Sequence, residues 1–116
     1  MGVDLSSCST EALLEEIKKR GGHPGALARA ALLAIRKSTD YNQTSETQDP
    51  HKVDRSIYFP FGTASYAQMI YTKAQRFNSL TLNELRGKPP NFEGLVDTAL
   101  DIINYAGFYV GSKDRE

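Results

Sequence analysis

Residues 92–110 read FEGLVDTALDIINYAGFYV, and this stretch decides the fold class. Its apolar residues recur every three or four positions, which is the spacing of one side of an α-helix. They form a broad arc made of Phe92, Leu95, Val96, Ala99, Ile103, Ala106 and Val110. We therefore predict a helix over residues 92–110 whose apolar arc faces the core.

Three more helices are predicted before this one. Ser9 is a suitable cap for the first helix, and Gly21-Gly22 ends it after a basic last turn at residues 18–20. The second helix is predicted over residues 25–38, because Pro24 suits a first turn. Its predicted inward stripe is Leu27, Ala31, Ala34 and Ile35, and its outward basic pair is Arg29 and Arg36. The third is predicted over residues 64–80, with Tyr66, Met69, Ile70, Phe77 and Leu80 on one face.

The segments between these helices complete the prediction. Residues 40–56 are almost free of apolar side chains and are predicted to form a long polar loop between helices two and three. At most a short strand pair is predicted, at residues 56–61. Residues 87–90 read GKPP and break the chain before the last helix. The fold class is thus all-α: a small bundle of about four helices in a single helical domain over residues 1–116.

Composition excludes several classes of partner. The 14 basic and 14 acidic residues give a net charge of zero, so nucleic acid is not expected as a partner. A neutral chain also tends to self-associate, so a homo-oligomer is expected. No apolar run is long enough to span a membrane. Cys8 is the single cysteine, which agrees with a reducing compartment, and we predict a cytoplasmic protein.

Three carboxylates on the last predicted helix form the first candidate site. Glu93, Asp97 and Asp101 are four residues apart and share one helix face with Asn104 beside them. Oxygen ligands on a ridge are suited to a hard cation, so these three acids are candidate Mg²⁺ ligands that would position a phosphate-bearing substrate. The alternative is an acidic face in contact with solvent.

Two cations on the third predicted helix form the second candidate site. Lys73 falls inside the apolar stripe, with Arg76 at its edge. A lysine there must reach out to water or meet an acid, and Asp97 or Asp101 is the natural partner. The two cations can instead bind a phosphate. An interhelical salt bridge is the simpler alternative.

Aromatic residues near the polar loop are candidates for stacking on a nucleobase. They are Tyr41, Tyr58, Phe59, Phe61 and Tyr66. The alternative is that they anchor the loop to the core. Asn104 and Tyr105 are the last candidate nucleotide-binding residues, because a polar amide late in an apolar segment is expected to have a binding partner.

Several stretches together resemble a known family. They are residues 37–42, 58–62 and 65–69, Lys73 with Arg76, and residues 91–95 and 97–105. The chain resembles phage and prophage proteins of the nucleotide modification associated domain type over about residues 30–110. The resemblance implies a small helical fold encoded near genes for unusual nucleotides, and no defined reaction. The last stretch is also similar to the metal-binding helix of all-alpha nucleotide pyrophosphohydrolases, but the second acidic motif of that family has no clear counterpart here.

Three functions are compatible with these features. The first is a small phage-type nucleotide-binding protein that acts in nucleotide metabolism or sequesters a nucleotide, including a host immune signal, in the bacterial cytoplasm. Its binding residues would be Lys73, Arg76, Tyr66, Asn104, Tyr105, Tyr41 and Phe61. The second is a Mg²⁺-dependent enzyme that hydrolyses or modifies a nucleotide. The third is a protein-binding inhibitor of a host factor, with an exposed patch and no pocket behind it.

Overall fold

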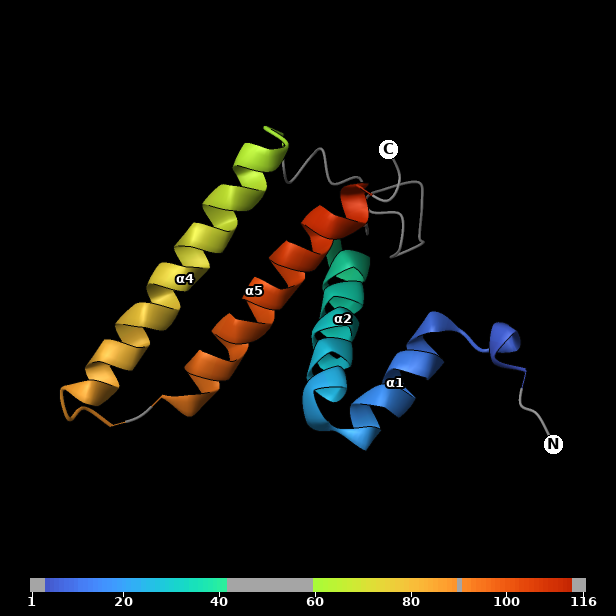
Figure 1. The fold of residues 1–116 in the computed structure, drawn as a ribbon, viewed down its shortest axis with the longest axis horizontal. Coiled ribbons are helices and arrows are strands. Elements are labelled where there is room, and N and C mark those ends of the chain that lie inside the picture. The colour runs from blue at the N-terminus through green and yellow to red at the C-terminus, as the bar shows by residue number, and fades with distance from the viewer. Residues whose placement is uncertain (1–3, 42–59, 90, 114–116) are drawn as a thin grey trace. The chain divides into compact units, whose positions relative to one another are not determined.

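The computed structural model describes residues 4–41, 60–89 and 91–113. These ranges hold a short 3-10 helix, Leu5–Ser7, and four α-helices: α1 (Thr10–Arg20), α2 (Gly22–Tyr41), α4 (Thr63–Leu85) and α5 (Phe92–Lys113) (Figure 1). The described residues contain no strand, so the all-α prediction is confirmed. Most of the predicted loop at 40–56, and all but Pro60 and Phe61 of the predicted strand pair, lie outside the described ranges. No helix in those ranges has the length and apolar content that crossing a bilayer requires.

The chain divides into two compact units, Met1–Val53 and Asp54–Glu116. The described part of the first unit is a hairpin of α1 and α2, and that of the second is a hairpin of α4 and α5 (Figure 1). The expectation of one domain over the whole chain stays a prediction.

Helix α1 begins and ends where its sequence predicts. The Ser9 hydroxyl oxygen accepts a hydrogen bond from the Ala12 N–H at 3.0 Å, as an N-cap does. Gly21 ends the helix with φ +76°, a conformation that glycine adopts without a steric penalty. Gly22 follows with φ +68°. These two positions reverse the chain so sharply that α2 begins at Gly22, three residues earlier than predicted.

The two helices of the first hairpin approach closely through small residues. Gly25 is buried, and a Cβ at this position would lie 3.2 Å from the Lys18 carbonyl oxygen and 3.3 Å from that of Ile17. Ala28, one turn further on, is also buried. The prediction that Leu27 faces inward was wrong, because its side chain is 43% exposed. A close backbone contact at Gly25 leaves the small residues inside and turns the neighbouring leucine outward.

The rest of α2 agrees in part with the prediction. Ala34 is buried as predicted, and Ala31 and Ile35 are half-buried. Ala30 is also fully buried, which the predicted stripe missed. Both Arg29 and Arg36 are exposed, as predicted. The helix continues to Tyr41, three residues past its predicted end, because nothing between Ser38 and Tyr41 is a strong breaker.

The second hairpin consists of two long antiparallel helices. Helix α4 continues five residues past its predicted end at Leu80, and Gly87 with φ +82° makes the turn that follows. Helix α5 begins after Asn91, whose side-chain oxygen accepts a hydrogen bond from the Gly94 N–H at 2.9 Å. Asn91 is therefore its N-cap.

Candidate functional site

A single ion pair joins α4 to α5 among the described residues. The Lys73 Nζ atom lies 3.1 Å from the Asp101 Oδ2 atom, and the two side chains are 26% and 21% exposed. The position of Lys73 inside the apolar stripe of α4 requires such a partner, because a desolvated ammonium is costly without one. The predicted interhelical salt bridge is confirmed, with Asp101 as the acid.

The face of α5 that meets α4 is not the predicted apolar arc. The Tyr66 ring of α4 lies edge-on to the Tyr109 ring of α5, with centroids 5.6 Å apart. Tyr109 is eight residues beyond Asp101, so both lie on one helix face, together with the buried Thr98. The prediction that the whole arc is inward was wrong, since Val96 is 41% and Val110 61% exposed.

This contact face was missed because it is partly polar. Thr98, Asp101, Tyr105 and Tyr109 follow a helical spacing of three or four residues. Thr98 is 2% exposed, and its hydroxyl donates a hydrogen bond of 2.7 Å to the carbonyl oxygen of Gly94. The threonine is thereby satisfied within its own helix, so it packs as a small side chain. The regular spacing is the signal that was available in the sequence.

One long edge of the second hairpin gathers most of the predicted polar residues. The contacts Tyr66–Tyr109 and Lys73–Asp101 fix how the helices face each other. At about 100° per residue, positions 76 of α4 and 97 and 104 of α5 then fall on the same side of that contact. We call Lys73, Arg76, Asp97, Asp101 and Asn104 the polar edge. Its two cations and two anions balance, so the edge has no net charge.

Exposure differs among the members of the polar edge. Arg76 and Asp97 are exposed, whereas Asn104 is half-buried. No described residue forms a salt bridge with Arg76, which is exposed and follows Lys73 by three residues on α4. The edge therefore offers one cation held in place and one that is accessible.

The three predicted metal ligands are spread along α5. Glu93 and Asp97 are exposed, and Asp101 contacts Lys73. Glu93 and Asp101 are about 12 Å apart along the helix axis, so one Mg²⁺ would directly contact at most two of the three acids. The described residues include no group of three or more His, Cys, Asp or Glu side chains that could hold a metal ion. The magnesium site stays a prediction.

The aromatic candidates occupy different surroundings. Tyr66 is 6% exposed and packs on Tyr109. This agrees with the alternative that the aromatic residues are part of the core and do not stack on a nucleobase. Tyr105 is half-buried and edge-on to Phe108, with ring centroids 6.1 Å apart. Phe61 is 80% exposed just before α4. The side chain of Tyr41, and all of Tyr58 and Phe59, lie outside the described part of the structure.

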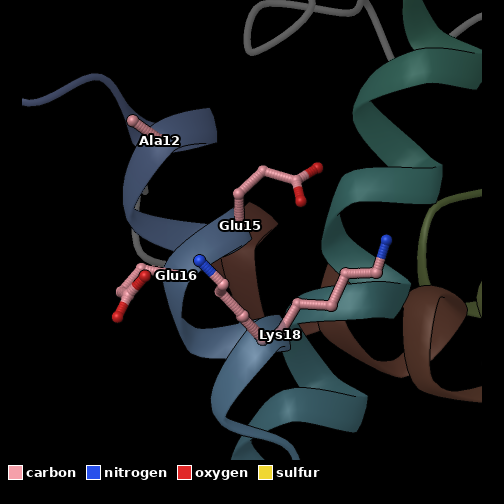
Figure 2. A pocket seen from close by; sticks show the side chains of 5 residues that line it. Ala12, Glu15, Glu16 and Lys18 are labelled. Carbon is pink, nitrogen blue, oxygen red and sulfur yellow. The ribbon is translucent and has the colours of Figure 1, made fainter.

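A separate hollow lies against α1 and has a volume of about 640 Å³. The described residues that line it are Ala12, Glu15, Glu16, Lys18 and Lys19. The carboxylates of Glu15 and Glu16 point to opposite sides of the helix, so they do not converge on a common point (Figure 2). All five side chains are exposed, which fits a charged helix face better than a binding site.

The polar edge is therefore the candidate site that the geometry of the second hairpin supports. It can donate hydrogen bonds and positive charge from α4 and accept hydrogen bonds from α5. Comparison of the chain with protein-family models, with curated proteins and with solved structures found no match.

Proposed function

We propose that the protein binds a nucleotide or a nucleotide-derived small molecule along the polar edge of the second hairpin. The observation that carries the proposal is the partly exposed Lys73–Asp101 pair at 3.1 Å, with the exposed Arg76 one turn along α4. A phosphate group can contact both cations, since Lys73 offers a point charge and Arg76 a planar fork of donors.

The remaining edge residues suit the uncharged parts of a nucleotide. The Asp97 carboxylate accepts hydrogen bonds from sugar hydroxyls or base amino groups. The Asn104 amide both donates and accepts, which matches the edge of a base. Because Lys73 already pairs with Asp101, a bound phosphate would compete with that carboxylate for the ammonium group. We therefore expect moderate affinity that depends on several contacts at once.

Sequestration of a nucleotide requires fewer functional groups at the site than catalysis does. Holding a nucleotide requires no nucleophile or general base, whereas acting on one does. The family resemblance supports a phage setting, so we propose a self-associating phage protein that binds a nucleotide, including an immune signal, inside a bacterial host.

Isothermal titration against a panel of mono-, di- and cyclic nucleotides, with inorganic phosphate and pyrophosphate as separate arms, tests the proposal. We expect one class of nucleotide to bind and Arg76→Ala to weaken it about ten-fold or more, because a charge-assisted hydrogen bond is worth roughly 1.5–3 kcal/mol. The matched control is Lys88→Ala, which removes one exposed cation outside the polar edge. Absence of heat across the whole panel, or equal weakening by both variants, would contradict the proposal.

A magnesium arm separates binding from catalysis. Asp97 and Asp101 are one helical turn apart, close enough along α5 for a single ion to contact both. Phosphate release that requires Mg²⁺ and is lost in Asp101→Asn, with nucleotide affinity retained, would replace sequestration by hydrolysis. Binding without release in either protein would leave sequestration as the function.

A further inference from the structure

The charges of the polar edge limit how much negative charge a ligand can bring to it. One of its two cations is already paired, because the Lys73 Nζ atom lies 3.1 Å from the Asp101 Oδ2 atom. A ligand that needs both cations must draw the ammonium group away, which leaves a half-buried carboxylate without its counter-ion. Arg76 is exposed and has no salt-bridge partner among the described residues. The edge therefore offers one positive charge without rearrangement.

The next charges along the second hairpin do not change this balance. Glu93 lies one turn before Asp97 on α5, and the cations Arg86 and Lys88 follow the end of α4. These charges have both signs and lie a helical turn or more from Arg76 along the hairpin. Exposed charges at such separations are partly screened at physiological salt, where the Debye length is about 8 Å.

We propose that the ligand of the polar edge is a nucleotide whose phosphate is a phosphodiester, such as a 3′,5′-cyclic mononucleotide or a dinucleotide joined by one phosphate. A phosphodiester carries a single negative charge, which one guanidinium fork balances through parallel hydrogen bonds to its two non-bridging oxygens. Arg76 can bind it while Lys73 stays paired with Asp101. This inference rests on the proposed function and names the class of nucleotide for the same site.

Nucleotides with a terminal phosphate fit this site less well. A terminal phosphate carries about 1.5–2 negative charges at neutral pH, and a triphosphate carries more. The added charge finds no second free cation on the edge, and it lies near the exposed carboxylate of Asp97. Repulsion between neighbouring like charges at a protein surface weakens binding about three-fold or more for each added charge. A diester should therefore bind better than the 5′-monophosphate of the same base, and the triphosphate should bind worst.

Isothermal titration in EDTA measures this preference, since EDTA removes divalent cations that would neutralise a triphosphate. The ligands are the 3′,5′-cyclic monophosphate, the 5′-monophosphate and the 5′-triphosphate of each common base, with dinucleotides and a single-stranded oligonucleotide as further arms. The cyclic monophosphate or the dinucleotide should bind about three-fold more tightly than the 5′-monophosphate and about ten-fold more tightly than the triphosphate. Equal affinities, a preference for the triphosphate, or binding of the oligonucleotide alone would overturn the inference.

Two acid-to-amide variants test the cause of the preference. Asp101→Asn releases Lys73 as a second cation, and Asp97→Asn removes the repulsion at an exposed position while keeping an acceptor oxygen. Each should raise the affinity for the triphosphate about three-fold or more relative to the diester. Glu84→Gln is the matched control, because it removes an exposed acid of α4 that is outside the polar edge, and it should leave the ratio unchanged. A ratio that neither variant changes would overturn the inference.

Failure of the proposed function and failure of this inference give different results. If no nucleotide binds, the proposed function is contradicted and the inference falls with it. If the triphosphate binds most tightly and Arg76→Ala weakens it, the polar edge stays the site and only the phosphodiester is overturned.

Discussion

The Lys73–Asp101 pair supports a quantitative prediction, which a double-mutant cycle of Lys73→Met and Asp101→Asn can measure. Exposed ion pairs contribute roughly 0.2–1 kcal/mol, whereas removing one partner of a fully buried pair costs about 3–5 kcal/mol. Here the side chains are 26% and 21% exposed and the two atoms are 3.1 Å apart. We therefore expect a coupling free energy of about 1–2 kcal/mol, which lies between these limits.

The two single substitutions should lower the free energy of unfolding by different amounts. A lysine that loses its acid can turn its long side chain toward water, whereas an aspartate cannot move its carboxylate far. We expect Asp101→Asn to cost about 1 kcal/mol and Lys73→Met about 2 kcal/mol, since the latter leaves a carboxylate in a partly desolvated place. At roughly 4 °C per kcal/mol for a chain of this size, Lys73→Met should lower the melting temperature by about 8 °C.

Urea unfolding followed by circular dichroism gives the four free energies of the cycle. Repeating it in 1 M salt should reduce the coupling only in part, because partly buried pairs are screened less than exposed ones. A coupling below about 0.3 kcal/mol would refute the reasoning, since that value belongs to a freely solvated pair. The exposed pair of Arg20 and Glu16 on α1, with side chains 77% and 55% exposed, is the control and should show such a small coupling.

Three further predictions concern glycines, and urea unfolding checks all of them. Gly25→Ala should destabilise the protein by about 1–2 kcal/mol, because its new methyl group would press on two carbonyl oxygens of α1, whereas Gly107→Ala on α5 has no atom within 4 Å and should stabilise it by up to about 1 kcal/mol. A gain in stability at Gly25 would show that the helices of the first hairpin are less closely packed than described. Gly94→Ala should also destabilise the protein, since its Cβ would lie 2.7 Å from the capping side chain of Asn91. In an Asn91→Ala background the same change should become stabilising, and additive effects would argue against that clash.

The sequence predicted the helices well and their contacts less well. Capping and breaking residues act locally, so Ser9 and Gly21 marked the ends of α1 correctly. Periodicity finds the most apolar side of a helix but does not identify its neighbour. On α5 the arc with Val96 and Val110 was the stronger signal, while α4 packs on the less apolar side that carries Thr98 and Asp101. The outward turn of Leu27 depends on the close approach at Gly25, and that approach is a property of two helices together.

The features of the candidate site that depend on the residue pattern of one helix could be predicted from the sequence. A lysine inside an apolar stripe must reach water or meet an acid, so an ion pair of Lys73 with Asp97 or Asp101 was predicted, and the structure shows that the acid is Asp101. The position of Arg76 beside that pair, on the same edge as Asp97, depends on how α4 and α5 face each other. Sequence spacing within one helix carries no information on that orientation.

The ion pair between α4 and α5 also limits how the two helices can slide past each other. A shift of one turn, about 5.4 Å, would separate Lys73 from the half-buried Asp101 and, in one direction, bring that carboxylate level with Met69 and Ile70 of α4. Contacts between aliphatic residues tolerate such shifts, because one methyl group replaces another, but a charge does not. The hairpin therefore has one favoured alignment, and replacing both charged residues by apolar ones of similar size would permit neighbouring alignments without much loss of stability.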